Sequence, residues 1–366
     1  MQIPLFKVFM DDSASSEVSK VLESGYIGQG SKVDEFEILL KDYLGTELLN
    51  TVNSCTSAIH LALHSIKDDR TEVLTTPLTC TATNFPILAN GLQLRWVDLD
   101  RNTCNLDLDD LRNKITANTL AVIVVHWGGY PIDLDKLKEI QEECFKKFGR
   151  KFHIIEDCAH ALGSTYKNKM IGTHGNHCAF SFQAIKHLTT GDGGMLISTD
   201  IESFNQIKLL RWYGLDRTSS ADFRCEQNIK DWGFKFHMND IAAAIGICNM
   251  KTLDSRVNAC TNNASFLRNN IKKGIMLESL DDRTSASWIF TFLVDKRDQF
   301  ISKMKEVGIA VSRVHDRNDK HECLSKFRCN LPNTDWISER MICIPCGWWL
   351  SDYDLNYIVH HVNGGW

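Results

Sequence analysis

One lysine stands in a segment whose residue types suit covalent chemistry. Four residues separate Ser181 from Lys186, and a turn through Thr190 leads to Gly194. A lysine beside a sheet edge, with hydroxyls and backbone N–H groups nearby, suits a cationic or Schiff-base role near a phosphate. A solvated lysine followed by a hairpin turn explains the same residues. The order of residues is neither a P-loop nor a Gly-x-Gly-x-x-Gly dinucleotide pattern.

Two adjacent carboxylates, Glu156 and Asp157, end an apolar run that begins at Ile154. Ligands of parallel α/β sheets bind beyond the carboxyl ends of the strands, so Asp157 is suitably placed for a cofactor contact. Successive side chains of a strand point to opposite faces, so at most one of the two carboxylates faces the site. A carboxylate that caps the next helix is the alternative interpretation.

A third candidate is the run from Asn53 to Ala58, at the expected start of a helix. Free N–H groups and hydroxyls at such a start suit a phosphate, although a plain N-cap explains the residues equally well. The three features follow one another as a phosphate-binding helix start, a strand-end aspartate and a lysine. That order predicts pyridoxal phosphate as the cofactor.

The elements that must position these residues have the pattern of an α/β chain. Apolar runs rich in Val and Ile alternate with segments of helical period, which is typical of a mostly parallel sheet. We expect strands at 72–76, 94–98, 121–126, 153–157, 179–182 and 194–198. We expect helices from about residue 54 to 66 and at 108–115, 134–148 and 239–250. A long charged helix after 251, a short strand at 288–294 and a helix near 299–307 predict a large domain at 1–250 and a small one at 251–366.

Composition sets the class of protein. The chain has 366 residues, 43% hydrophobic and 24% charged, with a formal charge of −5. This balance lacks the broad basic footprint of a nucleic-acid-binding protein. No apolar run approaches the ~18 residues of a membrane span, and the N-terminal residues do not resemble a secretory leader, so we expect a cytoplasmic protein. The 13 cysteines form no secreted framework.

Five segments, taken together and in order, resemble the DegT/DnrJ/EryC1/StrS family of nucleotide-sugar aminotransferases. They begin at Gly25, Asn53, Glu156, Phe180 and Gly233, and the resemblance covers essentially the whole chain. It implies the fold type I of aspartate-aminotransferase-like enzymes, with a large, mostly parallel seven-stranded sheet domain and a smaller C-terminal α+β domain. It also implies pyridoxal 5′-phosphate as cofactor, with pyridoxamine phosphate as its intermediate form, and a homodimer with a shared active site. Glutamate is the amino donor that we expect.

The resemblance also implies roles for individual residues. Lys186 would hold the cofactor covalently and shuttle a proton between the cofactor and the sugar carbon, and Asp157 would pair with the pyridinium nitrogen. His160 would contact the cofactor's 3-oxygen or ring face. The phosphate would be held by Thr56, the backbone of Ser57, Ser181 and, from the partner subunit, Lys235.

Two residues depart from the family pattern. Cys80 stands where many relatives place an aromatic residue over the cofactor ring, so stacking must be weaker or supplied elsewhere, for example by His160. Cys55 stands where Gly is common, so the backbone there must avoid a positive φ. Neither change removes a reacting group.

Only the resemblance to the family narrows the choice of reaction and substrate. Lys186 favours aminotransfer over the sugar dehydration of relatives that have histidine there. Segments 126–129 and 314–319 resemble the branch that makes 4-amino-4,6-dideoxysugars such as viosamine or perosamine from 4-keto-6-deoxyhexoses. Amination at C3, the choice among dTDP, UDP and GDP carriers, and a cofactor-binding regulator without turnover stay open.

Four residues are candidates for contacts with the sugar or diphosphate. They are Arg211, Arg313, His315 and Arg317. Guanidinium groups match phosphate geometry, but a surface salt bridge or a solvated side chain explains each equally simply. The spacing of His315, Asp316, His321 and Cys323 fits no standard metal site, so no metal is expected.

Overall fold

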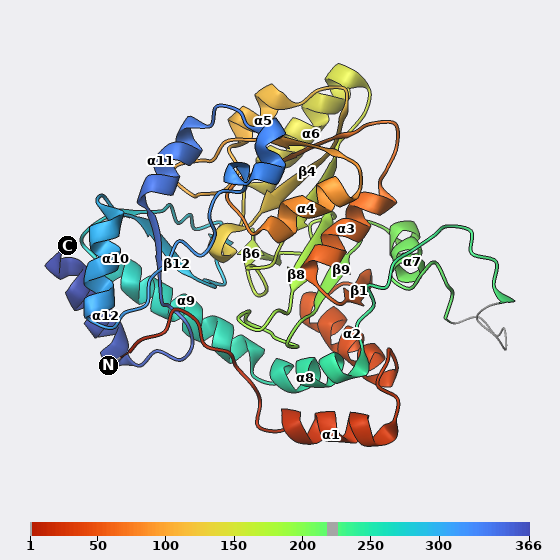
Figure 1. Ribbon diagram of the computed structural model, residues 1–366, viewed down its shortest axis with the longest axis horizontal. Helices are drawn as coiled ribbons and strands as arrows, with labels where there is room; N and C mark the ends of the chain where they lie inside the picture. The colour runs from red at the N-terminus through yellow and green to blue at the C-terminus, as the bar shows by residue number, and fades with distance from the viewer. Residues whose placement is uncertain (1, 218–225) are drawn as a thin grey trace.

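A seven-stranded sheet forms the centre of the computed structural model, which describes residues 2–217 and 226–366 (Figure 1). Its strand order is β1-β9-β8-β5-β4-β2-β3. Strand β9 runs antiparallel to both neighbours, whereas the other adjacent pairs are parallel. The strands are β1 Leu49–Val52, β2 Glu72–Thr75, β3 Gln93–Trp96, β4 Thr119–Val125, β5 His153–Asp157, β8 His177–Ser181 and β9 Gly194–Ile197.

The predicted α/β class and the mostly parallel seven-stranded sheet are therefore confirmed. All the strands expected from the sequence are present, with ends shifted by a residue or two. Strand β1 was not expected, because its four residues lie at the sheet edge and carry two polar side chains, Asn50 and Thr51. Both of these side chains are nevertheless buried.

Helices cover both faces of the sheet (Figure 1). Alternate residues of β4 divide between two cores, since Val122 and Val124 pack with the helices on one face of the sheet, whereas Ile123 packs with the helices on the other. The helices of this part are α1 Ala14–Ser24, α2 Ser31–Leu44, α3 Cys55–Ser65, α4 Thr81–Ala89, α5 Leu108–Lys114, α6 Leu134–Phe148, α7 Ile201–Leu210 and α8 Asp240–Met250. In the described ranges, no helix combines the length and apolar character that a membrane span needs.

The C-terminal part has a core of its own, around Phe292, Phe300 and Ile344. Its elements are α9 Leu253–Asn270, β10 Ile275–Met276, β11 Arg283–Thr284, β12 Phe290–Leu293, α10 Arg297–Glu306, η3 Asn318–Lys320, η4 Glu322–Phe327, α11 Pro332–Arg340, β13 Met341–Ile344 and α12 Asp352–Gly364. Strands β10, β12 and β13 form one small sheet.

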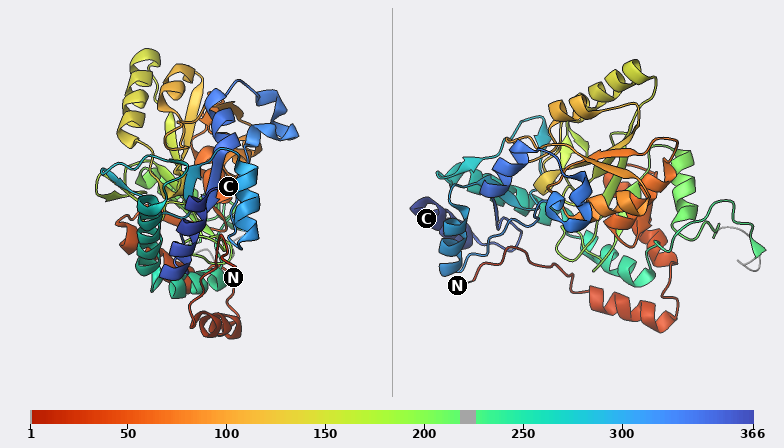
Figure 2. Two further views of the ribbon diagram at one scale, coloured as in Figure 1. Left: turned by 90° about the vertical axis from the view of Figure 1, so that its left-hand side faces the viewer. Right: turned by 45° about the horizontal axis from the view of Figure 1, so that its top comes forward.

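The domain boundary at residue 250 stays a prediction. Two backbone pairings connect the parts of the chain on either side of it. Ile3 forms a parallel bridge with Ile309, so the N-terminal segment lies against the C-terminal part (Figure 2). Strand β11 pairs with β6 (Thr165–Tyr166), which in turn pairs with β7 (Lys169–Met170). The two parts are therefore joined by backbone hydrogen bonds as well as by side chains.

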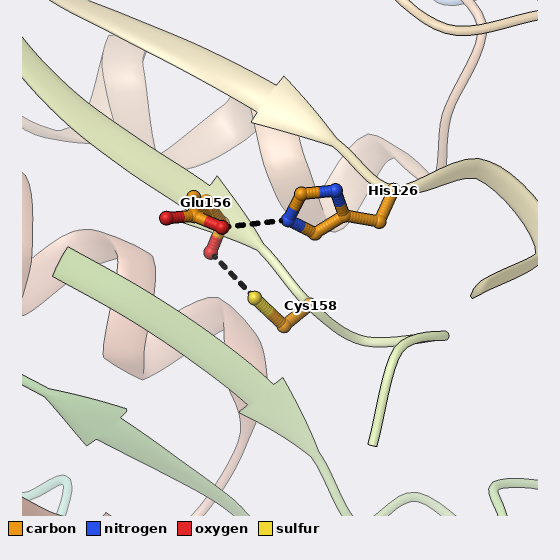
Figure 3. A group of neighbouring side chains, drawn as sticks. All are labelled: His126, Glu156 and Cys158. Carbon is orange, nitrogen blue, oxygen red and sulfur yellow. Dashed lines mark hydrogen bonds and ion pairs between the residues drawn. The ribbon is translucent and has the colours of Figure 1, made fainter. Parts of the chain in front are cut away.

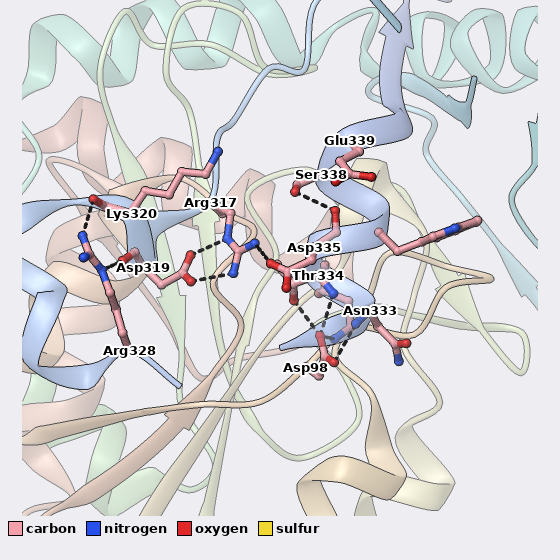
Figure 4. A network of polar contacts seen from close by, with 12 residues as sticks. Asp98, Arg317, Asp319, Lys320, Arg328, Asn333, Thr334, Asp335, Ser338 and Glu339 are labelled. Carbon is pink, nitrogen blue, oxygen red and sulfur yellow. Dashed lines mark hydrogen bonds and ion pairs between the residues drawn. The ribbon is translucent and has the colours of Figure 1, made fainter. Parts of the chain in front are cut away.

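A buried aspartate just after β3 caps a helix of the C-terminal part (Figure 4). Asp98 Oδ1 accepts hydrogen bonds from the Thr334 backbone N–H and hydroxyl, both at 2.7 Å. Asp98 Oδ2 accepts one from the Asn333 N–H at 2.9 Å. These donors lie in the first turn of α11, whose own N-cap residue, Leu331, has no side-chain oxygen. Asp98 thus supplies the cap from a distant part of the chain.

We expect the Asp98→Ala variant to lose about 1–3 kcal/mol of unfolding free energy, because four donors, the Leu99 N–H among them, lose their acceptor. Urea unfolding followed by circular dichroism measures the change. Asp98→Asn, which keeps one acceptor oxygen, should lie between the variant and the wild type. Equal midpoints for wild type and Asp98→Ala would contradict this assignment.

Candidate active site

A cavity of about 500 Å³ opens at the carboxyl ends of the parallel strands, with Val125 of β4 and Asp157 of β5 in its wall. This is the edge at which α/β sheets bind ligands. The structure brings together here most of the residues singled out in the sequence: Thr56, Cys80, Asp157, His160, Ser181, Lys186 and His315. Residues of the C-terminal part, among them Trp288, close the cavity on the other side.

Asp157 is held by donors on both carboxylate oxygens. Oδ2 accepts a hydrogen bond of 2.6 Å from the Thr83 hydroxyl, which is itself 2.7 Å from the Thr79 hydroxyl. Oδ1 accepts from the Ala159 N–H at 3.1 Å and from the Cys55 thiol at 3.8 Å. Burial raises the pKa of Cys55 well above its ordinary value, so this group remains a thiol. The carboxylate is therefore oriented by neutral donors, and no arginine or lysine of the described residues is hydrogen-bonded to it.

Glu156 does not line the cavity, as strand alternation predicts. Its carboxylate instead contacts His126 (Figure 3). The Ile132 N–H donates to His126 Nδ1 at 3.2 Å, so His126 Nε2 carries the proton and donates to Glu156 Oε2 at 2.8 Å. Asn176 donates to the other oxygen at 2.7 Å. Burial raises the pKa of Glu156, but these hydrogen bonds outweigh it, and the pKa lies below its ordinary value.

His126, Glu156 and Cys158 lie close enough to hold a metal ion (Figure 3). Both ring nitrogens of His126 and both carboxylate oxygens of Glu156 are already hydrogen-bonded within the protein. These hydrogen bonds connect the end of β4 to the end of β5, next to Asp157. The cluster therefore has the geometry of a structural hydrogen-bond network that holds the two strand ends together.

Lys186 lies inside the cavity and has no hydrogen bond from Nζ to another described residue. Its Nζ is 3.6 Å from the ring centroid of Trp288. Burial lowers the pKa of Lys186 to about 8, although Asp157 and the thiols of Cys55 and Cys80 oppose the shift. An amine with this pKa is partly unprotonated near neutral pH and can act as a nucleophile and base. The solvated-lysine interpretation does not describe this side chain.

Two neutral imidazoles lie beside the lysine. The ring of His160 stacks on Trp288, with centroids 3.9 Å apart, and is parallel to His315 at 5.8 Å. Burial and the Lys186 charge lower the pKa of His160 well below its ordinary value and that of His315 to about 4. His160 Nδ1 is buried and has no hydrogen-bond partner among the described residues, so it is available to a ligand.

The start of α3 faces the cavity through Thr56. Ser54 is the N-cap and accepts the Ser57 N–H at 3.1 Å, and the Ser57 hydroxyl donates to Asn53 Oδ1 at 2.6 Å. Ser57 is therefore engaged in the cap and does not line the cavity. A Cβ at Gly194 would lie 2.6 Å from the backbone nitrogen of Cys55, so only glycine lets the helix start approach β9 this closely.

The remaining candidates lie outside the cavity lining. Lys235 is exposed. Arg211 is buried, with an ion pair of 2.6 Å to Glu37, and Arg317 is paired with Asp319 at 2.6 Å. Arg313 pairs with Asp316 at 3.3 Å. Each of these guanidinium groups has a carboxylate partner, as the salt-bridge alternative expects. None of the three arginines lines the cavity.

Sequence reasoning did not single out three residues that shape the site. Thr83 orients Asp157, and Phe6 and Trp288 form part of the cavity wall. Thr83 lies three residues after Cys80, on the first turn of a helix that was not expected. Trp288 was seen only as the start of a strand, and no local pattern in the sequence indicates that it meets Lys186.

We expect the Glu156→Gln variant to lose about 1–3 kcal/mol of unfolding free energy at pH 7, because an amide oxygen cannot accept from both His126 and Asn176. The pKa of Glu156 is depressed in the fold, so the stabilisation is present above its unfolded pKa and is lost as pH falls through the lower folded value. Urea midpoints measured from pH 7 downward should therefore converge in acid. Glu139→Gln, at an exposed position, is the matched control; a pH-independent gap would contradict this account.

Comparison with known proteins agrees with this geometry. The model of the DegT/DnrJ/EryC1/StrS aminotransferase family matches residues 9–363. A UDP-4-amino-4,6-dideoxy-N-acetyl-β-L-altrosamine transaminase of Campylobacter jejuni is 29% identical over 92% of this chain and 90% of its own length. The crystal structure of AtS13 from Actinomadura melliaura is 42% identical, covers 100% of this chain and 99% of its own, and has a TM-score of 0.97. The sugar aminotransferase CalS13 from Micromonospora echinospora is 40% identical over 100% of both chains, with a TM-score of 0.96. The chain belongs to the DegT/DnrJ/EryC1/StrS aminotransferase family.

Proposed function

We propose that this protein is a pyridoxal-phosphate-dependent aminotransferase that converts a nucleotide-linked 4-keto-6-deoxyhexose to its 4-amino sugar. Glutamate is the proposed amino donor. The observation that carries the proposal is the desolvated Lys186 amine in one cavity with the oriented Asp157 carboxylate. A nucleophilic lysine and a fixed carboxylate are the two groups that this cofactor requires of a protein.

The residues present fit the cofactor. Lys186 would hold it covalently, Asp157 would face its ring nitrogen, and the unpartnered Nδ1 of His160 is free for a polar group. Thr56, at the start of α3, and Ser181 would hold the phosphate, as helix starts hold anions. The ring-stacking position is occupied by Cys80, which cannot stack.

When bound, pyridoxal phosphate acts as an electron sink for the substrate carbon. The chain's own residues supply the rest. Lys186, with a pKa of about 8, can take a proton from that carbon and return one as the other half-reaction proceeds. His160 and His315 are neutral, so they add no positive charge that would lower the pKa of the lysine. The rings of Trp288 and Phe6 and the side chain of Val314 reduce the access of water.

The substrate assignment rests on chemistry and on the relatives. The apolar wall of Leu5, Ile185 and Val314 suits a deoxygenated sugar, and His315 is the substrate candidate that the cavity contains. The Campylobacter relative is named for a 4-amino-4,6-dideoxy sugar. We therefore place this protein with enzymes that form viosamine- or perosamine-type 4-amino sugars.

A homodimer with a shared active site is part of the proposal. Lys235 is exposed and does not line its own chain's cavity, which suits a contact with the partner subunit's cofactor. The loop at 25–30 and the segment at 230–237 expose large apolar side chains, with Tyr26 83% and Trp232 65% exposed. A second copy of the chain would cover them. We further propose that the dimer is cytoplasmic.

We expect purified protein with pyridoxal phosphate to show the visible absorption band of a lysine-bound cofactor. Glutamate should shift this band to that of the pyridoxamine form. Lys186→Ala should lack the band, and its transamination rate should fall by about 10²–10⁴-fold or more. A wild type resupplied with cofactor that shows no such band would remove the catalytic proposal and favour a non-catalytic role.

The position of the new amine is tested by product analysis. Incubated with glutamate and either 4-keto- or 3-keto-6-deoxyhexoses on dTDP, UDP or GDP, the protein should give a product only from the 4-keto sugar, with carbon and proton NMR signals that place nitrogen at C4. The Lys186→Ala variant is the blank. An amine at C3, formed from a 3-keto sugar, would refute the C4 assignment while leaving aminotransfer in place.

A further inference from the structure

Trp288 lies at the meeting point of three contacts in the cavity wall. Lys186 Nζ is 3.6 Å from its ring centroid, and the His160 ring stacks on it at 3.9 Å with an interplanar angle of 15°. Phe6 stacks on it at 4.8 Å and 24°. Trp288 is buried, so the amine meets a dry aromatic surface on this side.

The indole is held in place by the backbone around it. Its Nε1–H donates to the Ile185 carbonyl at 2.9 Å, and that carbonyl belongs to the residue before Lys186. The Trp288 N–H donates to the Gly128 carbonyl at 3.0 Å. The indole is therefore tied both to the lysine segment and to the turn after β4.

The residue before Trp288 is in an uncommon conformation. Ser287 has a φ of +52°, which is rare for a residue with a side chain. Its N–H donates to Ser285 Oγ at 3.0 Å, and its carbonyl accepts from the Cys346 thiol at 3.2 Å. Strained backbone persists where surrounding contacts over-determine it, and such residues concentrate at functional sites.

We propose that Trp288 is a positioning residue for Lys186, whose amino group it holds over the indole ring beside His160 whenever that group is not bonded to the cofactor. This inference rests on the proposed function, because it concerns the same lysine. An ammonium over an indole face is attracted by the ring quadrupole. Nζ makes no hydrogen bond to a described residue, so the indole is its main contact.

In the described part of the chain, six titratable groups lie around the lysine. The titratable groups that interact electrostatically with it come from several elements and are Cys55, Cys80, Asp157, His160, His187 and His315. Burial raises the pKa of the Cys55 thiol and lowers the pKa values of the three histidines, so these four groups are neutral near neutral pH. A substitution that changes only the electron distribution of the indole ring therefore measures the contribution of Trp288 to the pKa of Lys186.

The test replaces tryptophan by fluorinated tryptophans, which weaken the ring quadrupole at nearly constant size. The pKa of Lys186 is measured by competitive acetylation and mass spectrometry of its peptide. With full fluorination, we expect this pKa to fall by about half a unit in the wild-type background. All nine tryptophans are labelled, so the same labelling in a Trp288→Phe background is the control and should leave the pKa unchanged.

The measurement is made on full-length protein treated with pyridoxal phosphate and glutamate, and is repeated without cofactor. The cofactor-free arm does not depend on turnover, so failure of the proposed function and failure of this inference are distinguishable. An unchanged pKa in the wild-type background, or equal shifts in both backgrounds, would overturn the positioning role.

A kinetic comparison adds a second readout. Trp288→Leu should lower kcat about tenfold or more while KM for glutamate changes by about twofold or less, and Trp288→Phe should restore most of kcat. Trp366→Leu, at a tryptophan packed on Phe300, is the matched control. A Trp288→Leu enzyme that folds and retains wild-type kcat would overturn the inference.

Discussion

The desolvation of one amine is the constraint on which the site depends. A lysine in water holds its proton tightly, whereas burial lowers the pKa of Lys186 to about 8. A carboxylate hydrogen-bonded to the amine would undo this effect. The structure instead gives the amine an aromatic ring at 3.6 Å, while the Asp157 oxygens are occupied by Thr83, Ala159 and Cys55.

Strand alternation divides two carboxylates between two tasks. Asp157 faces the cavity, and Glu156, next to it in β5, joins His126 and Asn176 on the opposite side. Had both faced the cavity, two like charges would have competed for one site. Because Glu156 fixes the ends of β4 and β5 together, the position of Asp157 depends on buried hydrogen bonds outside the cavity lining.

The C-terminal part completes the cavity through residues in unusual backbone conformations. Ser287 precedes Trp288 with a φ of +52°, and Val314 precedes His315 with a φ of +64°. The anchoring of α11 by Asp98 holds this part against the sheet. Arg317 also has a structural role here. Its ion pair with Asp319 stabilises the segment that carries His315, a residue of the cavity wall.

Local sequence determined most of the strands of the large sheet and the order of the reacting groups. Helical spacing predicted helix 134–148 with the bounds that α6 has, because helix periodicity is a local property. The order of Asn53–Ala58, Asp157 and Lys186 predicted the cofactor class, because parallel strands place their carboxyl ends at one edge. The sequence also predicted that at most one of Glu156 and Asp157 faces the site, because alternation of side chains is a property of a single strand.

Only the tertiary structure decided which side chains meet across the chain. Trp288 lies about 100 residues after Lys186 in the sequence, and no local pattern records their 3.6 Å contact. The exclusion of Arg211 from the cavity depends on its distant partner Glu37. Strand β1 was missed because its polar residues are buried by a pairing with β9 that lies far along the chain. Contacts of this kind depend on packing between segments, and a one-dimensional pattern reports only the neighbours of a residue along its own helix or strand.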